Sequence, residues 1–148
     1  MKKTVLHNMV TVTALLAAIS YVGTASAHSA NGALKAGAGS VDVYQTTCSK
    51  GTGGATGKFL TKVKAATKGV LVSIQASKGK LASHTTDALG GNAAYSPDAI
   101  IKSGGEGVYT ILVDKSGTGP INYVLEAHCQ TASGAHSGQT EPVQVQNQ

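Results

Sequence analysis

The chain has 148 residues and a formal net charge of +5, with twelve cationic side chains that are all lysines. Because arginine supplies most bidentate contacts to phosphate and guanine, an arginine-free chain does not favour nucleic-acid recognition, and the dispersed lysines predict a solvated surface. The length suits one domain with a single core.

The first 27 residues have the layout of a secretory signal peptide. Lys2 and Lys3 supply a positive start, an uncharged apolar run covers residues 10–19, and small residues at Ala25 and Ala27 fit a signal-peptidase site. The alternative, a membrane anchor, needs about 20 apolar residues, and this run is shorter. We therefore predict cleavage after Ala27, no membrane span afterwards, and a periplasmic or secreted product of net charge +3 once the two lysines are removed.

The remaining chain divides by composition. Residues 28–40 are small, polar and glycine-rich, and predict a flexible lead. Residues 41–133 carry the alternating segments and form the predicted domain. Residues 134–148 predict a polar tail, because the closing "PVQVQNQ" is short and rich in glutamine.

Within 41–133, alternating segments follow one another between turn signals. "VDVYQTTC" alternates from Val41, and "GVLVSIQAS" puts Val72, Ile74 and Ala76 on one face. "FLTKVKAA" is ambiguous by period alone. After the irregular stretch 82–99, "VYTILVD" and "INYVLEAHC" alternate again, and glycine-rich turns separate them. No helical repeat with caps follows the signal segment. The pattern predicts an all-β fold, an antiparallel jelly-roll-like β-sandwich of about seven or eight strands.

The two cysteines, Cys48 and Cys129, lie near the two ends of this region. In an exported protein such a pair predicts a disulfide, which closes a loop of about 80 residues and stabilises by roughly 4–5 kcal/mol. A thiolate metal or redox site is the alternative, but the spacing is not that of a CxxC motif.

The run "GEGVYTILVDKSGTGPINYVLEAHC" resembles the closing hairpin of bacterial pre-peptidase C-terminal domains, and the similarity covers about residues 41–129. The resemblance implies a secreted jelly-roll-like sandwich that accompanies exported enzymes. Calcium is not carried over, because Val72 to Gln75 stand where that family often has an aspartate-rich strand, and no attached catalytic domain is carried over either.

Catalytic signatures are incomplete throughout the chain. "TGGATGKF" lacks the first glycine and the magnesium-binding hydroxyl of a phosphate loop, and Ser77 to Lys80 match only the spacing of a Ser-x-x-Lys motif. The scattered carboxylates are not placed in pairs by the sequence. We therefore expect a protein that is not an enzyme and binds no obligatory cofactor.

The alternative function, copper binding, would depend on histidine residues. Cleavage after Ala27 would give His28 a free amine beside its imidazole, and these two nitrogens can chelate one copper ion. Glu126 and His128 share a face of the last predicted strand, so His128 is the expected third nitrogen donor. His136 lies in the predicted tail and is the weaker candidate.

The sequence thus predicts an exported, non-catalytic binding or structural accessory module whose partner, a protein or a small ligand, is unknown. The alternative is a periplasmic copper-binding protein that uses His28, His128 and Glu126. A carbohydrate-binding sandwich is a third reading; it is weakened by the absence of tryptophan and leaves Tyr95 as the candidate exposed aromatic residue.

Overall fold

A computed structural model describes residues 28–148, and the predicted signal peptide lies outside these residues. The described chain forms ten strands: β1 (His28–Leu34), β2 (Asp42–Ser49), β3 (Lys58–Ala65), β4 (Val72–Lys78), β5 (Leu81–Asp87), β6 (Ala99–Lys102), β7 (Gly107–Lys115), β8 (Ile121–Gln130), β9 (Gly138–Gln139) and β10 (Val143–Gln146). Over residues 28–148 no helix has the length and apolar character needed to cross a membrane.

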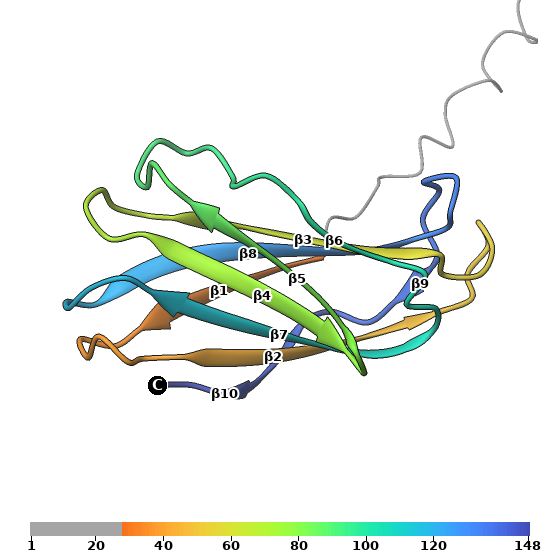
Figure 1. The fold of residues 1–148 in the computed structure, drawn as a ribbon, viewed down its shortest axis with the longest axis horizontal. Coiled ribbons are helices and arrows are strands. Elements are labelled where there is room, and N and C mark those ends of the chain that lie inside the picture. The colour runs from red at the N-terminus through yellow and green to blue at the C-terminus, as the bar shows by residue number, and fades with distance from the viewer. Residues whose placement is uncertain (1–27) are drawn as a thin grey trace, which may run out of the picture.

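The strands form two stacked antiparallel sheets (Figure 1). One sheet has the order β1-β8-β3-β6, and the other has the order β10-β2-β7-β4-β5, with the short β9 also paired to β2. The first eight strands thus pair 1 with 8, 2 with 7, 3 with 6 and 4 with 5. This nested pairing is that of an eight-stranded jelly roll, which confirms the predicted fold class.

The core lies between the sheets and follows directly from the period-two pattern. In β8 every second residue from Ile121 to Cys129 is buried, and the intervening residues are partly or fully exposed. The same alternation holds in β4 and β7. The aromatic rings of Phe59 and Tyr109 stack across the core with centroids 4.4 Å apart, so they pack β3 of one sheet against β7 of the other.

A disulfide joins the two sheets, as predicted. Cys48 in β2 is bonded to Cys129 in β8, and their Cα atoms are 5.6 Å apart. At the other end of the same two strands, Tyr123 in β8 is hydrogen-bonded to Asp42 and Tyr44 in β2. The two sheets are therefore linked through β2 and β8 at both ends.

All three segments predicted to be irregular contain strands. The stretch 82–99 holds most of β5, which pairs with β4. The lead includes β1, in which all seven residues from His28 to Leu34 pair with β8. The tail contains β9 and β10, which both pair with β2. The residues of these segments are too small or polar to signal a strand, and they are ordered by the backbone hydrogen bonds that long neighbouring strands offer at their free edges.

Candidate functional site

The outer face of the four-stranded sheet collects most of the polar side chains that sequence reasoning singled out. The strand register places residues of β3, β8 and β1 in rows across this face. Lys64, Val124 and Asn31 form one row, and Lys62, Glu126 and Ser29 form the next. His128 lies in a third row, opposite Leu60. Groups from three strands are thus brought together without any sequence motif.

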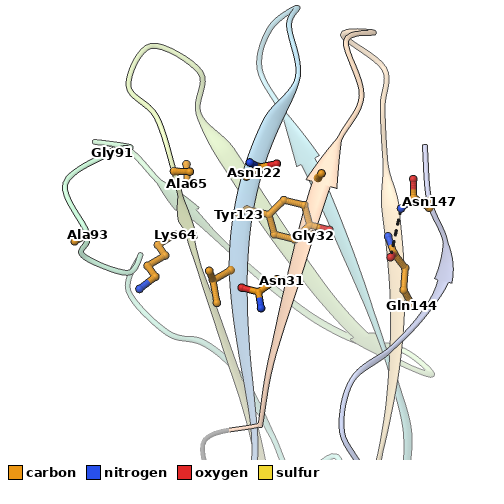
Figure 2. Close-up of a pocket in the computed structure, with 13 residues that line it drawn as sticks. Asn31, Gly32, Lys64, Ala65, Gly91, Ala93, Asn122, Tyr123, Gln144 and Asn147 are labelled. Carbon is orange, nitrogen blue, oxygen red and sulfur yellow. Dashed lines mark hydrogen bonds between the residues drawn. The ribbon is translucent and has the colours of Figure 1, made fainter.

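A hollow of about 780 Å³ lies at one end of this face (Figure 2). Its polar lining consists of Lys64 and the carboxamides of Asn31, Asn122, Gln144 and Asn147, and much of the rest is alanine or glycine. Figure 2 shows Lys64 on one side of β1, and Gln144 and Asn147 on the other side. Gln144 accepts a hydrogen bond of 3.4 Å from Asn147. The hollow therefore offers neutral hydrogen-bonding groups beside one cation.

Gly32 allows this part of β1 to approach the core closely. A Cβ atom on residue 32 would lie 2.2 Å from Cζ and Oη of Tyr123 and 2.6 Å from Oη of Tyr44. The Tyr123 ring therefore fits only against a glycine, and it lines the hollow from the inner side of β1.

An ion-pair cluster borders the hollow. Nζ of Lys62 lies 3.0 Å from Oε2 of Glu126, and the ammonium groups of Lys62 and Lys64 lie 4.8 and 4.6 Å from the centre of the Tyr95 ring. Burial and a hydrogen bond to Glu126 raise the pKa of Tyr95 to about 12. Burial alone would raise the pKa of Glu126, but the hydrogen bonds from Lys62 and Tyr95 outweigh it and lower that pKa. The charges of Lys62 and Glu126 therefore balance each other, and Lys64 adds one positive charge to the cluster.

The backbone holds Tyr95 in place beside the cluster. The next residue, Ser96, donates its amide proton to the carbonyl of Val63 at 2.8 Å, and its hydroxyl oxygen accepts from the Val63 amide at 3.1 Å. This two-way contact ties the loop between β5 and β6 to the edge of β3. Tyr95 is thus part of a fixed surface, but its hydroxyl and its ring are already engaged by Glu126 and by Lys62 and Lys64.

At the far end of the face lie two histidines. The rings of His128 and His136 meet edge to face, with centroids 5.4 Å apart. Nε2 of His128 is 3.7 Å from Oε2 of Glu126, and its Nδ1 is buried without a hydrogen-bond partner in the described chain. Burial, with a smaller contribution from His136, lowers the pKa of His128. This imidazole is therefore neutral at pH 7.

The structure does not bring His28 to His128. In β1, His28 is directly opposite Ala127, and opposed residues of an antiparallel pair share a face. Ala127 is fully buried, so His28 is on the inner side of the sheet while Glu126 and His128 are on the outer side. Nδ1 of His28 instead lies 2.6 Å from Oε1 of Glu141. The cleavage that would free the His28 amine falls on residues outside the described part.

Within residues 28–148 no group of three or more histidine, cysteine, aspartate or glutamate side chains is arranged to hold a metal ion. Both cysteines are in the disulfide and hold no metal. The three predicted donors are thus separated: His28 pairs with Glu141 on one face, whereas Glu126 and His128 lie together on the other.

Sequence reasoning missed Asn31, Asn122 and Lys64 as a group, and it did not place His136 beside His128. Asn31 stands between Ala30 and Gly32, in a segment without the alternating large apolar residues that indicate a strand. The strand that carries Asn31 was therefore not predicted. His136 follows a turn at Gly134, and a bridge to Gln130 returns it to the sheet. Gly134 in "TASGAHSG" was the available signal for such a return.

No known protein family, curated protein or solved structure matches this chain.

Proposed function

We propose that the chain is an exported, non-catalytic binding module that holds a polyhydroxylated ligand, such as a glycan, in the hollow on the four-stranded sheet. The observation that carries the proposal is the set of carboxamides around this hollow, four side chains beside the single cation Lys64. The sequence left the ligand unknown, and we now propose both its chemical class and the surface that binds it.

The chemistry of the lining favours hydroxyl groups as partners. Each carboxamide offers both donors and an acceptor, so Asn31 and Asn122 can each bind one hydroxyl as acceptor and a neighbouring hydroxyl as donor. The alanine and glycine residues leave room for a ring above the strands, and Lys64 adds an interaction with an acidic substituent. The alternative for Tyr95, stacking on a sugar, has less support because two lysine ammonium groups already contact its ring.

The lining also supports a non-catalytic role. Its thirteen residues include no histidine, cysteine, serine or carboxylate. Of the groups that can act as nucleophile or general base, they include only Lys64 and Tyr123, and the Tyr123 hydroxyl is already hydrogen-bonded to Asp42. Export is supported by the Ala25-Ser26-Ala27 cleavage pattern and by the disulfide, since disulfides persist in oxidising compartments. The likeness to pre-peptidase C-terminal domains remains a prediction and agrees with an accessory role.

A glycan array followed by calorimetry tests this proposal on the full secreted chain. We expect saturable binding of at least one oligosaccharide, with Asn31→Ala and Asn122→Ala each weakening it by roughly tenfold, because one good polar contact contributes about 1–1.5 kcal/mol. Gln45→Ala, on the exposed face of the other sheet, is the matched control and should bind as the native protein does. Binding that survives both asparagine changes would move the site elsewhere, and binding of peptides without any glycan would overturn the ligand class.

A further inference from the structure

The two histidines at the far end of the outer face come from different parts of the chain. His128 projects outward from β8, two residues before Gln130. His136 is paired with Gln130 across a short bridge, and this pairing places it on the same face as His128. Their ring centroids are 5.4 Å apart and their planes cross at 77°.

We propose that His128 and His136 form a surface site for a borderline transition-metal ion such as Zn(II), in which Glu126 orients the His128 ring. This site differs from the predicted copper site, because it omits His28 and its amine, and it is independent of the proposed glycan-binding hollow.

The separation of the rings suits two ligands of one ion. A Zn–N bond is about 2.0–2.1 Å, and the ring centre lies about 1 Å beyond the nitrogen, so each centroid stands roughly 3.2 Å from the metal. At a tetrahedral angle the two centroids would then be about 5 Å apart. The observed 5.4 Å is close to this separation, so the two rings stand at the spacing that one shared ion requires, and rotation of the side chains would aim the nitrogens at it.

The hydrogen-bonding state of His128 points to the ligand atom. Its Nδ1 is buried and has no partner among residues 28–148, whereas its Nε2 faces Oε2 of Glu126 at 3.7 Å. A proton on Nε2 is therefore favoured by the carboxylate, and the lone pair remains on Nδ1. A carboxylate that accepts from one ring nitrogen while the other binds metal is the usual way to fix a ligand histidine. Metal binding would satisfy the unpartnered atom.

Two features keep Glu126 and His128 ready for this role. Lys62 holds the Glu126 carboxylate at 3.0 Å, so the orienting group is fixed and ionised. Only 18% of the His128 side chain and 16% of the Glu126 side chain are exposed, so both groups are held at the surface of the sheet by their neighbours. Because residues 28–148 place two imidazoles here and no third ligand group of this kind, water would complete the coordination.

Borderline ions that prefer imidazole, namely Zn(II), Cu(II) and Ni(II), fit this donor set better than Ca(II) or Mg(II). Zn(II) is the preferred probe because it is redox-inert and takes tetrahedral sites. The disulfide would be unaffected by it, since neither cysteine is a free thiol.

Calorimetric titration of the full secreted chain with Zn(II) at pH 7 tests the proposal. We expect one ion per chain, with His128→Ala and His136→Ala each weakening binding by at least about tenfold and Glu126→Gln weakening it by about tenfold. His84→Ala, on the edge strand β5, is the matched control, and His28→Ala removes any contribution of the other histidine; both should bind as the native protein does.

Imidazole nitrogen NMR gives a second readout that does not depend on affinity. The apo protein should show His128 with its proton on Nε2, and Zn(II) should shift the Nδ1 signal of His128. Loss of binding in His28→Ala with full binding in His136→Ala would overturn the proposal, as would the absence of any saturable Zn(II) binding. Each variant's unfolding midpoint should be measured to show that it remains folded.

Discussion

The hydroxyl group of Tyr123 donates a hydrogen bond of 2.6 Å to Oδ2 of Asp42, across the core from one sheet to the other. Asp42 is fully buried, and its other oxygen accepts the Gln148 amide at 3.0 Å. Because the Tyr123 proton is engaged, the 2.9 Å contact with Tyr44 is donated by Tyr44. The chain of Tyr44, Tyr123 and Asp42 thus satisfies a buried carboxylate without a cation.

Tyr123→Phe should lower the free energy of unfolding by about 1–3 kcal/mol, since it leaves one oxygen of a buried carboxylate without its donor. Tyr44→Phe removes only a donor to the Tyr123 oxygen and should cost less, about 1 kcal/mol. Urea unfolding of both variants measures the difference. Equal losses, or a larger loss for Tyr44→Phe, would contradict the assigned direction of the two hydrogen bonds.

Gly32→Ala tests the close approach of β1 to the same network. The new methyl group would overlap the Tyr123 ring, with 2.2 Å to its Cζ, so the ring or the strand must move. We expect a loss of about 1–3 kcal/mol, the usual result of overpacking. Gly39→Ala, where a Cβ meets nothing within 4 Å, should stay within about 0.5 kcal/mol of the native protein. Similar midpoints for the two variants would mean that β1 is not held against Tyr123.

The core could be predicted from the sequence because burial there follows one local rule. The alternation from Ile121 to Cys129 specifies which side chains face inward, whatever the neighbouring strands are. The same rule failed for β1, whose small and polar residues give a weak pattern. Its strand conformation depends on pairing with β8, which is a tertiary effect and is not visible in the local sequence.

The candidate sites were harder to predict because they depend on register. His28 pairs with Ala127 and therefore shares its face of the sheet, whereas His128, the next residue in β8, points to the opposite face. The row that joins Lys64, Val124 and Asn31 likewise needs the pairing of three strands separated by up to 93 positions in the chain. No spacing within a single segment encodes either relationship, whereas Glu126 and His128, two apart in one strand, were correctly placed on one face.

Removal of the disulfide should lower stability strongly without changing the fold. The double variant Cys48→Ser with Cys129→Ser frees a loop of 81 residues and should lose about 4–5 kcal/mol in the chain-entropy model. The double change avoids an unpaired thiol that could form mixed disulfides. Unfolding in urea measures the loss, and far-ultraviolet circular dichroism checks that the sheets persist. A shift of the midpoint equivalent to less than about 1 kcal/mol would mean that the unfolded chain is already restricted without the bond.

The surroundings of the Asp87 carboxylate allow a prediction of how the free energy of unfolding depends on pH. Only 4% of this residue is exposed. Its oxygens accept backbone amide protons from Ala65 at 2.8 Å, Leu89 at 3.1 Å and Gly90 at 3.0 Å. Burial acts to raise its pKa, but these three hydrogen bonds outweigh burial and bring the pKa below the ordinary value of 3.8. The charged form is therefore favoured in the folded protein.

A folded-state pKa below that of the unfolded chain means that the unfolded chain takes up the proton first as the pH falls. The stabilisation by Asp87 is then fully present well above pH 3.8 and is lost as the pH falls through the folded-state pKa. Asp87→Asn, which keeps one acceptor oxygen, should cost about 1–3 kcal/mol at pH 7 and progressively less below pH 3.8. Asp98→Asn, at an exposed residue of the same connection, is the matched control and should stay within about 0.5 kcal/mol of the native protein at pH 7. Urea unfolding from pH 7 to pH 2.5 measures both variants. If the difference in free energy of unfolding between the native and Asp87→Asn proteins stays constant over this range, the charge of the carboxylate contributes nothing to the loop that Asp87 closes.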